Sequence, residues 1–159
     1  MRGFIIFVCG ALVGLLLETE RLDSRNPGVF ALNHININVD DIDEALAFYT
    51  QTMGFENVFS LANEEGQVGI IYLKVGDDTF LTLNTAGGAL PRGVTHMGIQ
   101  VDDLESARSI YRARGARLSE TFTGRNQEAR AFISGPQGIL IELSEYPPDS
   151  ALGKVLAGG

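Results

Sequence analysis

Leu32–Tyr49, with the sequence LNHININVDDIDEALAFY, aligns without a gap on Val94–Tyr111, VTHMGIQVDDLESARSIY. Seven of the eighteen aligned positions are identical, and His34 and His96 form one of the identical pairs. This internal repeat predicts that the body of the 159-residue chain consists of two copies of one unit. Units that each bury a single face are expected to pack against each other. The two modules are predicted near residues 30–86 and 93–146.

Both copies open with the alternation of polar and apolar residues that is typical of a half-buried strand. In the first copy, Ile35, Ile37 and Val39 fall on one face of this strand. The opposite face is polar and is expected to line a solvent-filled cavity, with both histidines on it. Its members are His34, Asn36 and Asn38 in the first copy and His96, Gly98 and Gln100 in the second.

A helix is predicted after each of these strands. The pairs Asp40-Asp41 and Asp102-Asp103 stand at N-cap positions, which explains them as helix caps rather than as metal ligands. Apolar residues then recur at helical spacing, as in a helix that covers a sheet. Gly54 and Gly115 are suited to end the two helices.

Three further short strands are predicted after each helix, so that the order is βαβββ in both copies. They fall near 56–62, 67–75 and 78–84 in the first copy and near 117–122, 128–134 and 138–144 in the second. In the last strand, Glu142 alternates with apolar residues and is the acidic member of one face. A lone carboxylate inside a cavity is costly unless it is paired, protonated or bound to a metal.

A βαβββ repeat with a histidine in each first strand and a glutamate in the last strand resembles the vicinal oxygen chelate superfamily. This group includes glyoxalases, bleomycin and fosfomycin resistance proteins, methylmalonyl-CoA epimerases and extradiol dioxygenases. The resemblance implies an α+β domain over residues 28–146, in which the tandem modules form a cupped mixed sheet with helices on its outer face. Residues 147–159 are then a C-terminal tail.

The resemblance also implies metal ligands on the first and last strands of each module. By position these are His34, His96 and Glu142, with Thr82 at the fourth place, where relatives carry glutamate or glutamine. Two imidazoles and one carboxylate leave open positions on the metal and favour Fe(II) or Mn(II), although Zn, Ni or Co is possible. The same three positions hold metal in extradiol dioxygenases and fosfomycin transferases, whereas glyoxalase I and the epimerases normally use four.

Few acid–base groups remain if His34, His96 and Glu142 bind the metal. Thr82 cannot serve as the proton-transfer base of a glyoxalase, so Tyr72 or a metal-bound hydroxide would have to replace it. The extradiol signature is incomplete, because Phe132 stands at its tyrosine position and no further histidine exists in the chain. Strand alternation predicts which side chains line the substrate-binding cavity. Arg125 and Arg130, which are expected on the 120s loop, could add a contact to an anionic substrate. The predicted lining residues are Asn36, Asn38, Thr82, Gln100, Phe132 and Arg130.

The leading functional hypothesis is a divalent-metal-dependent enzyme, of lyase, isomerase or dioxygenase type, that polarises vicinal oxygens of a small substrate. The alternative is a non-catalytic small-molecule-binding protein, like the bleomycin resistance members, that uses the same cup. Two modules can pair within one chain or across a homodimer, and the repeat does not choose between these arrangements.

Composition restricts the other function classes. The chain is 45% apolar and 20% charged, which excludes disorder as its main state, and its net charge of −8 argues against a nucleic-acid partner. A single cysteine excludes an intramolecular disulfide framework and a Cys-rich zinc site. Residues 1–27 are interpreted as a hydrophobic leader or membrane anchor plus linker, because Phe4–Leu17 carries no charge and follows Arg2. This predicts an exported or membrane-anchored protein with its body outside the cytoplasm, and a hydrophobic helix packed in the fold or an interface is the alternative.

Overall fold

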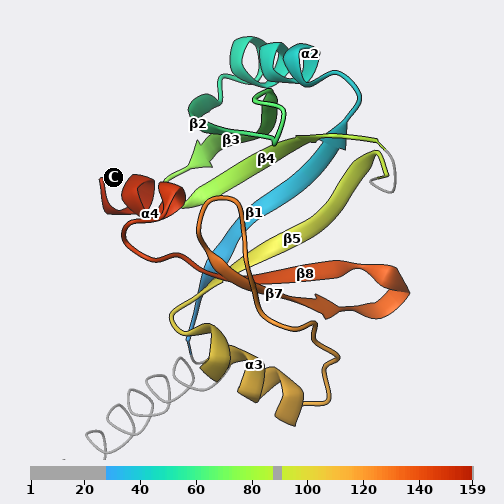
Figure 1. The fold of residues 1–159 in the computed structure, drawn as a ribbon, viewed down its shortest axis with the longest axis vertical. Helices are drawn as coiled ribbons and strands as arrows, with labels where there is room; N and C mark the ends of the chain where they lie inside the picture. Colours follow the sequence, from blue (N-terminus) through green and yellow to red (C-terminus); the bar gives the residue numbers. More distant parts are fainter. Residues whose placement is uncertain (1–27, 88–90, 159) are drawn as a thin grey trace, which may run out of the picture.

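The structure is a computed structural model that describes residues 28–87 and 91–158 (Figure 1). Its strands form one eight-stranded mixed sheet with the order β2-β3-β4-β1-β5-β8-β7-β6. The first four strands are β1 (Val29–Val39), β2 (Glu56–Ala62), β3 (Val68–Gly76) and β4 (Thr79–Thr85). The second four are β5 (Gly93–Val101), β6 (Phe122–Thr123), β7 (Ala129–Ser134) and β8 (Leu140–Glu145).

The two modules meet at the centre of this sheet, where β1 pairs antiparallel with β5. The pairing places His34 opposite Gly98 and Asn36 opposite His96. Each module then adds its last strand on the outer side, because β4 runs parallel to β1 and β8 runs parallel to β5. The modules therefore pair within one chain, and the strand histidines of both lie at the seam.

Helices cover the outer face at both ends of the sheet, with α2 and α3 at opposite ends of the long axis in Figure 1. Helix α2 (Ile42–Ala47) continues as a π-helical turn, η2 (Phe48–Thr52), and α3 spans Leu104–Ala113. The side chain of Asp41 accepts hydrogen bonds from two backbone N–H groups of α2, and that of Asp103 accepts one from Ser106. These bonds confirm that the repeated aspartates cap helices.

Two apolar cores lie between the helices and the sheet. In the first module, Leu73 and Leu83 are fully buried and pack with the apolar face of β1 and with α2. In the second module, Leu143 and Ala131 are fully buried, and Leu104 of α3 joins them. The apolar side of each first strand is thus used for packing, which leaves its polar side on the inner, concave face. The α+β expectation is confirmed.

The structure adds detail in the second module and at the C-terminus. The strand predicted near 117–122 is reduced to an isolated bridge between Leu118 and Ile133 and the two-residue β6. A 3₁₀ turn, η3 (Pro136–Gly138), precedes β8. The C-terminal tail contains a helix, α4 (Ala151–Ala157), that begins at the capping residue Ser150.

The hydrophobic stretch Phe4–Leu17 lies outside the described residues. Within the part that the structure describes, no helix combines the length and the apolar character needed to cross a membrane.

Candidate metal centre

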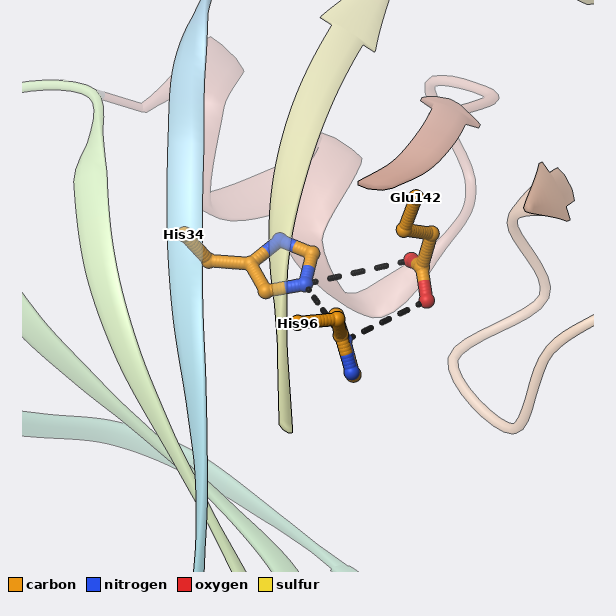
Figure 2. A group of neighbouring side chains, drawn as sticks. All are labelled: His34, His96 and Glu142. Atoms are coloured by element: carbon orange, nitrogen blue, oxygen red, sulfur yellow. Dashed lines mark hydrogen bonds and ion pairs between the residues drawn. The ribbon is translucent and has the colours of Figure 1, made fainter. Parts of the chain in front are cut away.

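Three potential ligands converge on the concave side of the sheet. His34 comes from β1, His96 from β5 and Glu142 from β8, and their side chains point toward one another (Figure 2). The Nε2 atoms of the two histidines are 3.3 Å apart. The Glu142 carboxylate lies 3.5 Å from Nε2 of His96 and 3.9 Å from Nε2 of His34. The structure therefore brings together the three residues that the repeat singled out.

The spacing of these atoms fits one shared cation. Ligands bound at about 2.1 Å lie roughly 3.0 Å apart in octahedral and roughly 3.5 Å apart in tetrahedral coordination. The two shorter separations fall within that range, and the longest exceeds it by a few tenths of an ångström. Small side-chain adjustments would suffice for all three groups to bind the same ion.

His34 is held in the form that a metal requires. Burial lowers its pKa from 6.5 to about 4, although the nearby Glu142 carboxylate opposes this shift, so the imidazole is neutral at physiological pH. Its Nδ1 lies 3.2 Å from the side-chain oxygen of Asn33, which can only accept a hydrogen bond. The ring proton therefore resides on Nδ1, and the lone pair of Nε2 is directed toward the other two ligands.

The environment of His96 also favours the neutral form of the imidazole. Burial lowers its pKa, and the opposing influence of Glu142 is weaker. The Thr95 hydroxyl lies 3.2 Å from Nδ1, and the ring of Phe132 packs edge-on at a centroid distance of 5.5 Å. Two neutral imidazoles thus face one carboxylate, which is a donor set suited to a divalent cation.

Glu142 is almost fully buried, with 2% of its side chain exposed. The Ser144 hydroxyl donates a hydrogen bond of 2.6 Å to Oε1, and Nη1 of Arg130 lies 3.2 Å from Oε2. These partners compensate part of the cost of burying the carboxylate. Arg130 belongs to β7 rather than to the 120s loop, so its expected loop position is wrong, and the strand directs it at the triad.

Thr82 occupies the place that is equivalent to Glu142, as the pairing of β1 with β4 shows. Thr82 is opposite Asn36, whereas Glu142 is opposite Gly98, and Asn36 and Gly98 are themselves repeat equivalents. The Thr82 hydroxyl donates to the side-chain oxygen of Asn36 at 2.6 Å, and the amide of Asn84 donates to the same atom. The first module therefore contributes a closed hydrogen-bond network where a fourth ligand would stand.

A cavity of about 800 Å³ opens in front of the triad. This volume lies within the range of pockets that bind small organic ligands. Of the predicted lining residues, Gln100 is absent from its wall, because its side chain accepts a hydrogen bond from Asn33 behind the site. The other predicted members, Asn36, Asn38, Thr82, Phe132 and Arg130, all line it.

A family model described as the Glyoxalase/Bleomycin resistance protein/Dioxygenase superfamily matches residues 31–143. The chain belongs to this superfamily. The match confirms the resemblance drawn from the two histidines, the glutamate and the βαβββ order.

Individual relatives of this glyoxalase-superfamily protein are enzymes by name. A probable lactoylglutathione lyase of Vibrio parahaemolyticus serotype O3:K6 is 27% identical, over 74% of this chain and 92% of the relative. The mitochondrial methylmalonyl-CoA epimerase of Bos taurus is 25% identical, over 72% of this chain and 73% of the epimerase. A variant of the Streptomyces coelicolor methylmalonyl-CoA epimerase, solved with 2-nitronate-propionyl-CoA, has a TM-score of 0.66 and 25% identity and covers 77% of this chain and 98% of its own. These names agree with the expectation of an enzyme of lyase or isomerase type.

Tyr72, the predicted base, lies on the cavity wall with 6% of its surface exposed. Its ring stacks on Phe59 at a centroid distance of 4.4 Å, and its hydroxyl accepts a hydrogen bond of 3.0 Å from the Asn126 amide. Burial raises its pKa above the usual range for tyrosine. The phenol is therefore neutral and better suited to donate a hydrogen bond than to remove a proton, and its catalytic role stays a prediction.

Two residues of this superfamily site, Asn33 and Glu128, were not predicted from the sequence, and Gly98 was placed on the polar face without a role. Asn33 fixes the His34 tautomer, yet it stands on the apolar face by simple alternation, and a β-bulge between Leu32 and His34 brings it inward. Glu128 is buried 3.3 Å from Arg130, and no periodicity marks it. Gly98 was visible in the repeat, because the first module has asparagine there, and its lack of a side chain leaves room for the His34 ring.

Proposed function

We propose that the protein is a divalent-metal-dependent enzyme of lyase or isomerase type that acts on the vicinal oxygens of a small organic substrate. The observation that carries this proposal is the convergence of donor atoms from His34, His96 and Glu142 within 4.8 Å of one another. The lyases and epimerases among the relatives support the reaction class. Both histidines of the chain are ligands in this proposal, so the acid–base histidine of an extradiol dioxygenase has no counterpart.

Two imidazoles and a carboxylate favour Fe(II) or Mn(II), and Zn, Ni and Co accept the same ligand types. When bound, such a cation supplies Lewis acidity that polarises substrate oxygens. The neutral state of His34 and His96 keeps their lone pairs available, and the hydrogen bond from Asn33 orients the first of them.

The remaining cavity residues bind and orient the substrate. The Tyr72 hydroxyl accepts from Asn126, so its own proton is free for a hydrogen bond to a substrate oxygen. The side-chain oxygen of Asn36 is already occupied by two donors, Thr82 and Asn84, which makes this wall a rigid, neutral surface. Proton transfer at a carbon atom requires a base, and Glu142 is the only carboxylate among the described cavity residues.

The scarcity of general bases in the cavity favours the second candidate function, a binding protein that holds its ligand without turnover. The two candidates differ in proton exchange. An enzyme of the proposed type should incorporate deuterium from D₂O at the carbon next to the thioester carbonyl of S-lactoylglutathione or of methylmalonyl-CoA, the compounds in the names of two relatives. Binding of either compound with no exchange or turnover by the metal-loaded protein would support the binding function.

Metal content provides the direct test of the centre. We expect about one divalent ion per chain when the full-length protein is purified without chelator and analysed by mass spectrometry of its elements. The variants His96→Ala and Glu142→Ala should lose that ion. Glu120→Ala is the matched control, since it makes the same chemical change at a side chain that is 97% exposed. Circular dichroism should show that each variant is folded. Wild-type protein without stoichiometric metal, or variants that retain it, would refute the centre.

A further inference from the structure

The wall of the cavity carries more cationic than acidic side chains, whereas the chain as a whole is acidic. The chain carries 12 basic and 20 acidic residues. Among the described residues that line the cavity, however, the cationic side chains are Arg125 and Arg130, and Glu142 is the only carboxylate. A divalent ion at the triad would make this region more positive still. A concave, partly desolvated site of one sign attracts ligands of the opposite sign.

Arg130 lies directly beside the triad. Its Nη1 is 3.2 Å from Oε2 of Glu142 and 3.3 Å from Oε1 of Glu128. The guanidinium carbon lies 4.8 Å from the ring centroid of Phe122 and 5.9 Å from that of Phe132. Two carboxylates and two aromatic rings thus hold the side chain in one orientation, with 24% of it exposed.

The guanidinium retains hydrogen-bonding capacity in this position. Both ion pairs use the same nitrogen, Nη1, and the buried Nε of Arg130 has no hydrogen-bond partner in the described part of the chain. An arginine offers five N–H donors in a planar fork, which matches a carboxylate in a bidentate manner. Because Nε itself is buried, a substrate carboxylate next to the triad would accept from the guanidinium N–H groups in the part of the side chain that is exposed to the cavity.

Glu128 is the residue that positions this arginine. Its side chain is 2% exposed and lies under the backbone of Gly124, where a Cβ atom would come within 1.8 Å of Oε1. Its Oε2 is buried without a partner, so its contact with Arg130 is the principal compensation for its burial. In this ion pair, Arg130 lines the cavity, whereas Glu128 is not among the residues of the cavity wall.

Arg125 adds a second cation at the rim. It is exposed and belongs to the turn that joins β6 to β7. Its Nη1 lies above β3, 2.8 Å from the position that a Cβ atom of Gly69 would take. Gly69 and Asn63 line the cavity there, so the turn of the second module reaches across to the first module.

We propose that the substrate is an organic acid whose carboxylate binds Arg130 beside the triad, with Glu128 as the positioning residue and Arg125 as a second cation at the entrance. The inference rests on the proposed metal-dependent function for the placement of the neighbouring vicinal oxygen. It specifies the substrate class as 2-hydroxy or 2-oxo acids and their larger derivatives, because the carboxylate must lie next to an oxygen that faces the triad.

Two small probes test the charge requirement. Glycolate and glycolamide have the same number of heavy atoms and the same vicinal oxygens, but only glycolate is negative. Each is titrated into full-length protein loaded with one equivalent of Zn(II), and into metal-free protein, with amide chemical shifts as the readout. The loaded state of every variant is first verified by elemental analysis, since removal of Arg130 alters the charge beside Glu142.

Arg130→Met should weaken glycolate binding about tenfold and change glycolamide binding less than twofold, as expected for the loss of a charge-assisted hydrogen bond. Glu128→Gln should weaken glycolate selectively as well, which a general loss of stability would not do. Arg125→Met should have a smaller effect, and one that disappears at high salt. Arg117→Met is the matched control, because Arg117 is exposed and lies outside the cavity wall, and it should leave both affinities unchanged.

The outcomes separate this inference from the proposed function. If wild type binds Zn(II) but glycolate does not bind, or Arg130→Met weakens both probes equally, the anion site is refuted and the metal centre stands. If wild type binds no metal, the proposed function fails. The anion site then stands only if metal-free wild type prefers glycolate and Arg130→Met abolishes that preference, and it is refuted otherwise.

Discussion

Gly98 shows how a single missing side chain shapes the metal centre. It lies opposite His34 in the pairing of β1 with β5, and a Cβ atom at this position would come within 2.0 Å of the imidazole ring. The ring is 3% exposed and contacts Asn33, His96 and Glu142, so any shift away from the added methyl group would disturb this arrangement. We expect Gly98→Ala to displace His34 and to weaken metal binding by more than about tenfold, as measured by competition with a chromophoric chelator.

Gly76→Ala is the matched control for this substitution. It adds the same methyl group to a strand glycine whose surroundings are open within 4 Å and whose backbone conformation other residues can adopt. The control should bind metal as wild type does. Equal affinities of the Gly98 variant and wild type would mean that His34 is not a ligand.

His34 should also make the metal-free protein sensitive to mild acid. Its pKa is about 4 in the folded state, against 6.5 for an unperturbed histidine. The titratable and charged groups that face it are Glu142, His96, Arg130 and the Tyr146 hydroxyl. Above pH 6.5 the ring is neutral in both states and contributes nothing. As the pH falls from 6.5 to 4, the unfolded chain takes up a proton that the folded chain does not, so the free energy of unfolding decreases by about 3 kcal/mol.

Urea denaturation of chelator-treated protein across this pH range measures the effect. His34→Gln should remove the contribution of His34 to the slope. The part that comes from His96, whose pKa is also lowered by burial, and from the carboxylates remains in both proteins. Parallel profiles for the variant and wild type would show that His34 does not cause the acid sensitivity.

The sequence predicted the chemistry of individual residues best where the repeat marked them. The two histidines are repeat equivalents, and strand alternation placed them and Glu142 on one face. Arg130 and Glu128 were harder to place, because their importance comes from a contact between two side chains of β7 and its preceding turn. Gln100 was expected in the cavity, but Asn33 holds it behind the site, in a contact that depends on the β-bulge in β1.

At the scale of elements, α4 closes one side of the inner face. Leu152 of this helix is fully buried against Tyr72 and Phe80 on the inner side of the first module. Tyr72 also receives the Asn126 hydrogen bond from the turn of the second module. Helix and turn thus meet at the same tyrosine, and this part of the cavity wall depends on the C-terminal segment.

Leu152→Ala should therefore reduce the free energy of unfolding by about 2–4 kcal/mol, because it removes a fully buried side chain from a packed cluster. Urea denaturation measures this loss. Lys154→Ala is the control on the exposed side of the same helix and should change stability by less than about 0.5 kcal/mol. A loss below about 1 kcal/mol for the Leu152 variant would mean that α4 is not part of the stable fold.

Helices and strands were predicted correctly where a local pattern repeats. They were missed where contacts with distant segments determine whether the element forms. The caps at Asp41 and Asp103 were visible because a side chain at the N-cap satisfies helix N–H groups locally. The shortened β6 was not, since pairing of the 117–123 region with β7 is limited to a bridge at Leu118 and two residues. Helix α4 was missed because its stability comes from Leu152 packing on strands about 70 residues earlier in the chain.

At the scale of the whole molecule, the sheet joins the two modules into one structure. The repeat predicted two modules, but it did not choose between pairing within a chain and pairing across a dimer. The antiparallel contact of β1 with β5 answers this for the single chain, and it brings one ligand from each first strand to the seam. The third ligand, Glu142, comes from the neighbouring β8.

A metal bound across this seam should stabilise both modules together. Because the ion binds the folded state, a concentration one hundred times its Kd should raise the free energy of unfolding by about 2.7 kcal/mol. Native-state hydrogen exchange measures this rise separately for amides of Leu83 in the first core and Leu143 in the second. Equal increases are expected in wild type and in Glu120→Ala, and neither core should gain protection in Glu142→Ala. A gain confined to the second module would show that the modules open independently, because two of the three ligands, His96 and Glu142, belong to that module while β1 supplies only His34.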